Sequence, residues 1–252
     1  MGLYLESAAT LGKRTAEMHL ALGLPTADPA FSPEPFASED LESLIKGLED
    51  HAASVFDVLK ERVSSLPDEL LEIAASVLSR RRRILQHFAT FSSRDSGSSL
   101  PQRIRIHGDY HLGQVLRVKT DFVILDFEGE PARPLAYRRS KQCALKDVAG
   151  MLRSFSYAAY ATLINYTARR PEDLATLEPW ARFWERSVSA EFLRAYRQAA
   201  QGAHFLPSDE SDFQNLLDAF LLDKALYEVL YELNSRPAWV RIPLMGIMSL
   251  SL

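Results

Sequence analysis

The spacing of apolar residues predicts that most of this chain is helical. Between residues 3 and 22 the apolar side chains recur every three or four positions, as they do on the buried face of a helix, and Gly23 is placed to end it. Comparable patterns predict five further helices, over about 38–63, 67–91, 145–169, 173–201 and 209–233. Ser38 precedes two acidic residues and is predicted to be the N-cap of the second helix.

One short region has a β-type pattern instead. The segment RIRIH from Arg103 and the segment QVLRV from Gln114 alternate polar and apolar residues, and the run FVILD that ends at Asp126 is β-branched. KTD at positions 119–121 separates the last two segments. Residues 114–126 are therefore predicted to form an antiparallel hairpin.

Three stretches are predicted to be irregular. Residues 23–38 hold four prolines and form a loop, and residues 92–101, SSRDSGSSLP, form a flexible polar turn. The tail SRPAWVRIPLMGIMSL, residues 235–250, is expected to be irregular but packed. The whole is an α+β fold, mostly α-helical, with one small hairpin. We expect one domain over 1–252, made of a helical part (1–102), a central part (103–130) and a second helical part (131–252).

Composition narrows the class of protein. A net charge of −4 and a pI near 5.9 argue against a nucleic-acid binder. The basic run Arg80–Arg83 is more typical of a solvated or ion-paired helix face than of a phosphate-binding patch. Cys143 is the single cysteine, which excludes an internal disulfide. The first residues do not resemble a signal peptide, and no apolar run is long enough to span a membrane. We therefore expect a soluble, cytoplasmic protein without membrane contact.

The hairpin and its approach carry the candidate chemistry. Asp109 lies in the loop before the first strand and Asp126 ends the second, so an antiparallel hairpin would bring the two to the same open end. Two carboxylates held together repel one another and favour a cation between them. Gln114 adds a neutral oxygen. Oxygen donors of this kind suit Mg²⁺ better than zinc.

Two histidines lie in the same loop. The spacing of His107 and His111 could indicate zinc, but Gly108 and Asp109 between them break any helix, and no cysteine or third histidine is near. His107 is interpreted as a packed residue that supports the loop. His111 is interpreted as a substrate or phosphate contact at the loop tip.

These residues together resemble a kinase motif. The series His107-Gly108-Asp109, Gln114 and Asp126-Phe127-Glu128-Gly129 is similar to the catalytic loop and metal-binding segment of the aminoglycoside-phosphotransferase-like kinases, which are related to the protein kinases. The wider stretches HGDYHLGQVL, ILDFEGEPARPL, KDVAGMLRSF and ALYEVLYELNSRPAWVRIPL resemble the maltokinases in particular. The resemblance covers almost the whole chain, most strongly 103–157 and 222–246.

The resemblance implies a kinase-like carboxyl-terminal lobe. Maltokinases phosphorylate maltose with ATP at its anomeric hydroxyl, in trehalose and glycogen metabolism, and are often fused to or partnered with trehalose synthase. By this resemblance the partners are maltose, ATP and trehalose synthase, and the cofactor is Mg²⁺.

The resemblance also assigns roles. Asp109 would be the catalytic base, and Asp126 with Gln114 would hold Mg²⁺. His111 is a second catalytic candidate because of its place at the loop tip. Gln114 stands where other kinases have Asn, although the maltokinase pattern itself has Gln. Glu128 would contact the metal or the sugar. Asp147 and Arg153 would support the loop.

The acceptor sugar is expected on the late helix. Lys224, Tyr227, Glu228 and Tyr231 share one helical face, and Asn234, Arg236 and Trp239 follow. A tyrosine stripe at this spacing is more often core than binding site, but Lys and Glu within the stripe argue against a dry core. The resemblance to maltokinases favours sugar contact.

The sequence shows no Gly-rich phosphate loop and no convincing strand before Arg103. The β lobe that grips ATP in this family would precede residue 1, so the resemblance implies the carboxyl-terminal lobe alone. We expect little kinase activity from this chain by itself, and self-association through the apolar surface that the other lobe would cover.

Two alternatives remain open. One is a non-catalytic sugar-binding or scaffolding module that partners trehalose synthase, although such a module has no chemical need for Asp109, Gln114 and Asp126. The other is a kinase for an aminoglycoside or choline, which would need an acidic cleft or an aromatic cage. Lys224 and Arg236 in the stripe suit a neutral polyol better than either.

Overall fold

The computed structural model describes residues 1–90 and 101–250. The polar turn predicted over 92–101 lies, apart from Pro101, outside the described residues. The chain divides into two compact units, Met1–Pro35 with Pro101–Leu217 and Phe36–Leu100 with Asp218–Leu252. The single domain expected from the sequence stays a prediction.

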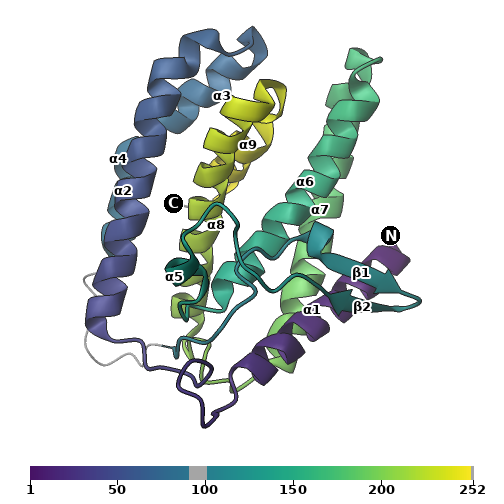
Figure 1. The fold of residues 1–252 in the computed structure, drawn as a ribbon. Coiled ribbons are helices and arrows are strands. Elements are labelled where there is room, and N and C mark those ends of the chain that lie inside the picture. The colour runs from purple at the N-terminus through teal and green to yellow at the C-terminus, as the bar shows by residue number, and fades with distance from the viewer. Residues whose placement is uncertain (91–100, 251–252) are drawn as a thin grey trace. The chain divides into compact units, whose positions relative to one another are not determined.

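Three long helices build the first unit (Figure 1). α1 (Gly2–Leu22) packs along α7 (Leu174–Ala199), and α7 packs in turn against α6 (Leu145–Thr167). A Cβ atom at Gly12 would lie 2.3 Å from the carbonyl oxygen of Phe192, so α1 and α7 approach as closely as they do because this position is glycine. The short elements η3 (Pro171–Asp173) and α5 (Leu135–Arg138) complete the helical part.

The predicted hairpin is confirmed and lies beside α1 (Figure 1). After the 3₁₀ turn η2 (Leu112–Gln114), β1 (Val115–Val118) pairs antiparallel with β2 (Asp121–Ile124). Arg14 of α1 donates two hydrogen bonds to the Asp121 carboxylate, at 2.7 and 2.9 Å. This ion pair, together with the packing of β2 on α1, fixes the hairpin to the helical layer.

The segment RIRIH does not form a strand of this sheet, so that part of the prediction is wrong. Arg103 and Ile104 make isolated bridges, to Glu34 and to Gln142. Ile104 is fully buried, while Arg103 and Arg105 are partly exposed on the opposite side. The alternation of polar and apolar residues therefore corresponds to an extended segment with one buried side. This segment is bridged to two loops and does not belong to a sheet.

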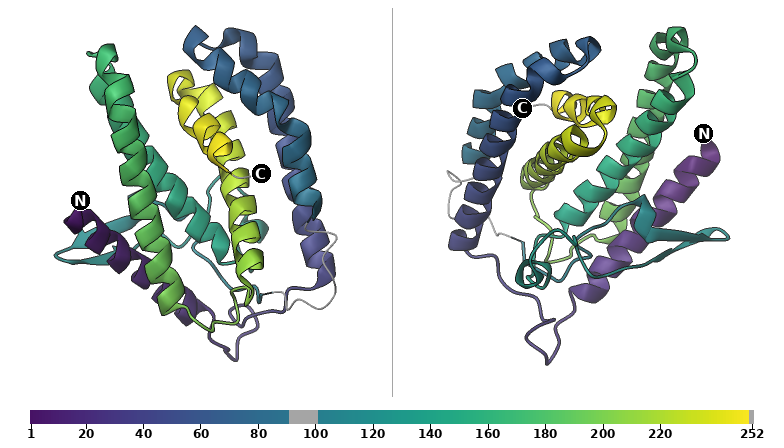
Figure 2. Two further views of the ribbon diagram at one scale, coloured as in Figure 1. Left: turned by 180° about the vertical axis from the view of Figure 1, so that it is seen from behind. Right: turned by 45° about the horizontal axis from the view of Figure 1, so that its top comes forward.

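The second unit is helical in its described part (Figure 2). α2 (Ser38–Arg62) runs beside α4 (Arg81–Thr90), and α3 (Asp68–Ser79) packs against α9 (Arg241–Ser249). The 3₁₀ turns η1 (Val63–Ser65) and η4 (Pro237–Trp239) join these helices. α8 (Glu210–Ser235) begins in the first unit and continues into the second from Asp218.

Three details of the second unit correct the sequence prediction. The helix expected over 67–91 breaks at Arg80, because α3 packs on α9 whereas α4 packs on α2. The N-cap of α2 is Ala37 rather than Ser38, and the Asp40 carboxylate accepts the Ala37 backbone N–H at 3.0 Å.

The tail is the third correction. It is packed as predicted, but it is helical rather than irregular. Pro243 is tolerated there because it occupies the first turn of α9, where the backbone N–H has no partner within the helix. No helix in the described part of the chain is long and apolar enough to cross a membrane.

Candidate active site

A buried carboxylate organises the loop that carries Asp109. Asp147, in the first turn of α6, is 1% exposed and accepts the backbone N–H groups of His107 at 2.7 Å and Gly108 at 2.9 Å. It also accepts a hydrogen bond from Nε2 of His19 on α1, at 3.1 Å. The sequence predicts Asp147 as a loop support, and two of these hydrogen bonds join it to that loop.

The environment of Asp147 keeps it charged. Burial alone raises the pKa of a carboxyl, but the hydrogen bond and charge of His19 and the Gly108 N–H more than offset it, so the pKa of Asp147 lies below its usual range. His19 is itself fully buried, and its Nδ1 meets the Tyr196 hydroxyl at 2.9 Å. Since the carboxylate can only accept, His19 donates from Nε2.

His107 joins the loop to the end of β2. Its ring is buried, and Nε2 donates to the Leu125 carbonyl at 2.7 Å while Nδ1 accepts the Asp109 N–H at 3.4 Å. The ring also lies 5.0 Å from the Phe127 ring, measured between centroids. His107 therefore braces the segment that contains Asp109 against the segment that contains Asp126.

Two glycines allow these segments to meet. Gly108 and Gly129 both have positive φ angles, 83° and 75°, and a Cβ atom at Gly108 would lie 3.2 Å from the Gly129 Cα. Asp126 also has a positive φ, 65°, a conformation that aspartate adopts more readily than most residues. The loop after His107 and the turn after β2 thus lie against one another, and the metal site predicted there stays a prediction.

Asp109 and His111 lie on the open side of this loop. The Asp109 carboxylate is 3.9 Å from Nε2 of His111, whose side chain is 42% exposed. Nδ1 of His111 accepts the Gly113 N–H at 3.0 Å and so caps η2. One ring nitrogen of His111 is therefore used in a hydrogen bond within the loop, and the other is directed towards Asp109. The predicted contact of His111 with substrate stays a prediction.

The candidate metal ligands are oxygen donors near the same turn. Gln114 ends η2, and its backbone carbonyl accepts the Leu125 N–H at 2.9 Å. Asp126 follows Leu125 in the chain and is exposed. Glu128 pairs with Arg138 at 3.6 Å and is otherwise open to solvent. Among residues 1–90 and 101–250, no three histidine, cysteine or acidic side chains gather as they would around a metal ion. Carboxylate and amide oxygens of this kind fit Mg²⁺.

The predicted acceptor residues lie in the second unit. Lys224, Tyr227, Glu228 and Tyr231 share one side of α8, where the Lys224 ammonium lies 4.9 Å from the Tyr227 ring. Glu228 is 7% exposed and Tyr231 is 50% exposed, so the stripe is not a dry core. Whether it contacts a sugar stays a prediction.

An ion pair between an exposed arginine and a buried glutamate follows the stripe. Arg236 donates two hydrogen bonds to Glu232, at 2.7 and 3.0 Å, and its guanidinium lies 4.2 Å from the Trp239 ring. Asn234 accepts a hydrogen bond from Arg62 at 2.7 Å, which ties α8 to the end of α2. The positive charge of Arg236 is therefore compensated within the chain, and it does not oppose a cationic ligand.

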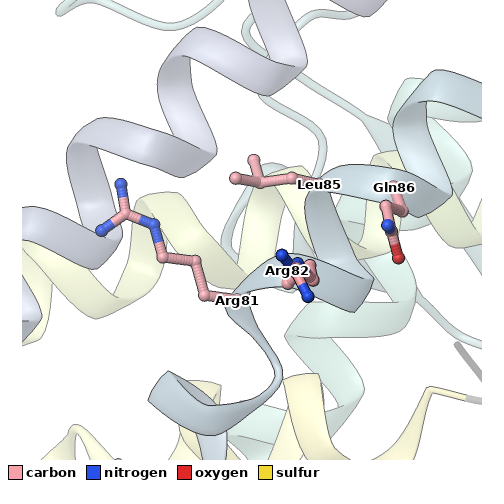
Figure 3. Close-up of a pocket in the computed structure, with 4 residues that line it drawn as sticks. All are labelled: Arg81, Arg82, Leu85 and Gln86. Carbon is pink, nitrogen blue, oxygen red and sulfur yellow. The ribbon is translucent and has the colours of Figure 1, made fainter.

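The arginine run on α4 behaves as a partly ion-paired helix face. Arg81, Arg82, Leu85 and Gln86 line a shallow hollow (Figure 3), and Arg81 reaches across to the Asp57 carboxylate of α2 at 2.6 Å. These lining residues all come from one helix, which does not make a phosphate site.

Several supporting residues were not predicted from the sequence. Thr15 bonds the buried Tyr110 hydroxyl at 2.9 Å, and Ser154 accepts the Leu112 N–H at 3.0 Å. Arg153, which was predicted to support the loop, donates to Ser156 at 3.4 Å. The sequence offers one signal for such residues. Thr15 and His19 are polar, lie four residues apart and occupy positions of α1 that are buried in the structure.

The helical layer, the small hairpin and the carboxylate-anchored loop define a kinase-like α+β fold that is mostly helical. No family model matches the chain. It is 28% identical over 237 residues to a glucosamine kinase from Streptacidiphilus jiangxiensis, covering 94% of this chain and 47% of that protein. It is 33% identical over 138 residues to a glucosamine kinase from Mycolicibacterium smegmatis, covering 54% and 32%.

Solved structures agree with these relatives. A glucosamine kinase in complex with glucosamine, ADP and inorganic phosphate superimposes with a TM-score of 0.72 at 27% identity, over 98% of this chain and 54% of that one. A second glucosamine kinase structure gives a TM-score of 0.71 at 28% identity, over 96% and 53%. The chain thus spans about half the length, or less, of the curated relatives it matches.

Proposed function

We propose that this chain carries the catalytic loop and acceptor face of an ATP-dependent sugar kinase. The observation that carries the proposal is the loop His107–Asp109, which Asp147 anchors and His107 braces against the turn that contains Asp126. Asp109 would orient the sugar hydroxyl and accept its proton. Asp126 and Gln114 would hold Mg²⁺, which supplies charge neutralisation at the phosphates.

Glucosamine is the acceptor that we favour. The similar proteins are named glucosamine kinases, and an amino sugar carries a positive charge that needs a carboxylate. Glu228 provides one on the acceptor stripe, and the bond of Arg236 to Glu232 weakens the argument for a neutral polyol, which then rests on Lys224 alone. Maltose is the second candidate, because the stretches 103–157 and 222–246 resemble maltokinases.

The test is ligand-observed NMR on the purified chain, since sugar and metal binding can be measured without turnover. Saturation transfer to glucosamine is expected to exceed that to maltose and to fall at least fivefold in Glu228→Gln. The exposed Glu42 on α2 provides the matched control, and Glu42→Gln should leave the signal unchanged.

The same samples test the metal site. Mn²⁺, used as a probe for a hard cation, should enhance water-proton relaxation, and Asp126→Asn should remove most of that enhancement. If saturation transfer to maltose exceeds that to glucosamine, maltose becomes the favoured acceptor. Absence of both sugar and Mn²⁺ binding would overturn the proposal.

A further inference from the structure

A second concave site lies in the first unit, on residues that the proposed reaction does not use. It is a pocket of about 540 Å³ formed by three stretches of chain that are remote in sequence. The lining residues come from the proline-rich loop, the extended segment after Pro101 and the segment after α5: Pro29, Ala30, Phe31, Glu34, Arg103, Arg105, Arg139, Ser140 and Lys141. Its volume is in the range of sites that hold small molecules.

Hydrogen bonds hold together the chain segments that form this pocket. Glu34 and Arg103 exchange two backbone hydrogen bonds, at 2.8 and 2.9 Å, and Ile104 exchanges two with Gln142, at 2.9 and 3.1 Å. Because Ile104 is buried, its neighbours Arg103 and Arg105 both project to the other side of the extended segment. Lys141, also buried, donates to the Pro29 carbonyl at 2.6 Å and binds Glu34.

The charge of the pocket is unbalanced. Four cationic side chains line it against a single carboxylate, Glu34, in a chain whose net charge is −4. Glu34 is already shared by Lys141 and Arg103. Arg105 donates to the Arg139 carbonyl, and no group in the described part of the chain is bonded to the Arg139 guanidinium. Cations held together in this way favour an anion between them.

The pocket also offers a surface for an attached ring. The Arg105 guanidinium lies 5.6 Å from the Phe31 ring centroid, and Phe31 is 49% exposed. A monocarboxylate would neutralise one of the two uncompensated arginines, whereas a phosphate dianion neutralises both and accepts paired N–H bonds from guanidinium groups. We propose that this pocket binds a small phosphate monoester, with its phosphate on Arg105 and Arg139 and its organic part against Phe31.

Isothermal titration of the purified chain with glucose 6-phosphate tests this proposal. EDTA in the buffer removes any phosphate binding that depends on a divalent cation at the candidate active site. Glucose 6-phosphate should bind, inorganic phosphate should bind at least fivefold more weakly, and glucose should give no heat. The affinity should fall as salt is added, because the attraction is electrostatic.

The variant Arg139→Glu should reduce affinity for glucose 6-phosphate at least tenfold, and it should fold normally because its side chain is exposed. The matched control is Arg133→Glu, at another exposed arginine that lies against the Tyr137 ring outside the pocket, and it should bind as the unmodified chain does. Absence of binding, or binding that Arg139→Glu leaves intact, would overturn the site. Equal affinity for inorganic phosphate or for glucose would overturn the assignment to a phosphate ester.

Discussion

Asp147 accepts three hydrogen bonds with two oxygen atoms, and the loop that carries Asp109 depends on two of them. In Asp147→Asn the amide nitrogen can only donate, so at least one of these donors loses its acceptor in a buried place. We expect a loss of about 2–3 kcal/mol in the free energy of unfolding, measured by urea denaturation. Asp50→Asn, which removes an exposed pair with Lys46, should change it by less than about 0.5 kcal/mol.

The same variant has a pH signature. The pKa of Asp147 is lowered in the folded chain, so its contribution is complete above the ordinary aspartate pKa of about 3.9 and is lost as the pH falls through the folded value. The difference in stability between the unmodified chain and Asp147→Asn should therefore stay constant from pH 7 to about 5 and shrink below about pH 4. A difference that grows on acidification would contradict the assigned hydrogen bonds.

At the scale of single residues, the sequence predicted the candidate residues that belong to a motif or lie close to it in the chain. Asp147 lies in the first turn of the long helix that follows the hairpin, and its support of the loop was predicted from the resemblance to the kinases. Its partner His19 lies 128 residues away, and a histidine on an apolar helix face carries no mark of its partner. Long-range pairing of this kind depends on how α1 and α7 pack, which the period of apolar residues does not specify.

At the scale of elements, α6 is shaped by the loop it supports. A Cβ atom at Gly150 would lie 2.6 Å from the carbonyl oxygen of Tyr110, so Gly150→Ala must displace the backbone between Asp109 and His111. We expect Gly150→Ala to lower the free energy of unfolding by about 1–3 kcal/mol.

Gly47 on α2 provides the matched comparison, because nothing lies within 4 Å of the Cβ atom that alanine would add there. Gly47→Ala should raise the free energy of unfolding by about 0.5–1 kcal/mol, since alanine restricts the unfolded chain and favours helix. Thermal denaturation of both variants checks the opposite signs. Equal shifts in the melting temperature would contradict the close approach at Gly150.

The positions of the elements were more predictable than their ends. Helices such as α1 and α6 follow from the apolar period, and the hairpin from its alternation. The break at Arg80 and the helix over 241–249 were missed, because each depends on packing between α3 and α9 rather than on local preference. Proline at 243 argued against a helix, but a first-turn position removes the objection.

At the scale of the whole molecule, the candidate residues fall into two groups. The loop that carries Asp109 belongs to the first compact unit, and the predicted acceptor stripe on α8 belongs to the second. The sequence prediction placed both in one domain because almost the whole chain resembles a single kinase-like lobe. The division into units is a property of long-range contacts, and no composition shift marks it.

The hairpin gives the molecule an exposed apolar face. Leu116 is directly opposite Val123, and these side chains are 54% and 46% exposed, with Val118 and Leu125 on the same face at 45% and 44%. A contiguous apolar face of this kind favours association. The double variant Leu116→Lys with Val123→Glu replaces it by an opposite-charge pair across the strands, which the hairpin tolerates.

Sedimentation velocity at increasing protein concentration measures the association. The unmodified chain should form larger species as the concentration rises, and the double variant should need at least tenfold more protein to do so. Leu24→Lys, at an apolar residue that is 61% exposed outside the hairpin, should associate like the unmodified chain. If the unmodified chain stays monomeric at every protein concentration, this face does not drive self-association. Association that the double variant retains would place the contact on another surface.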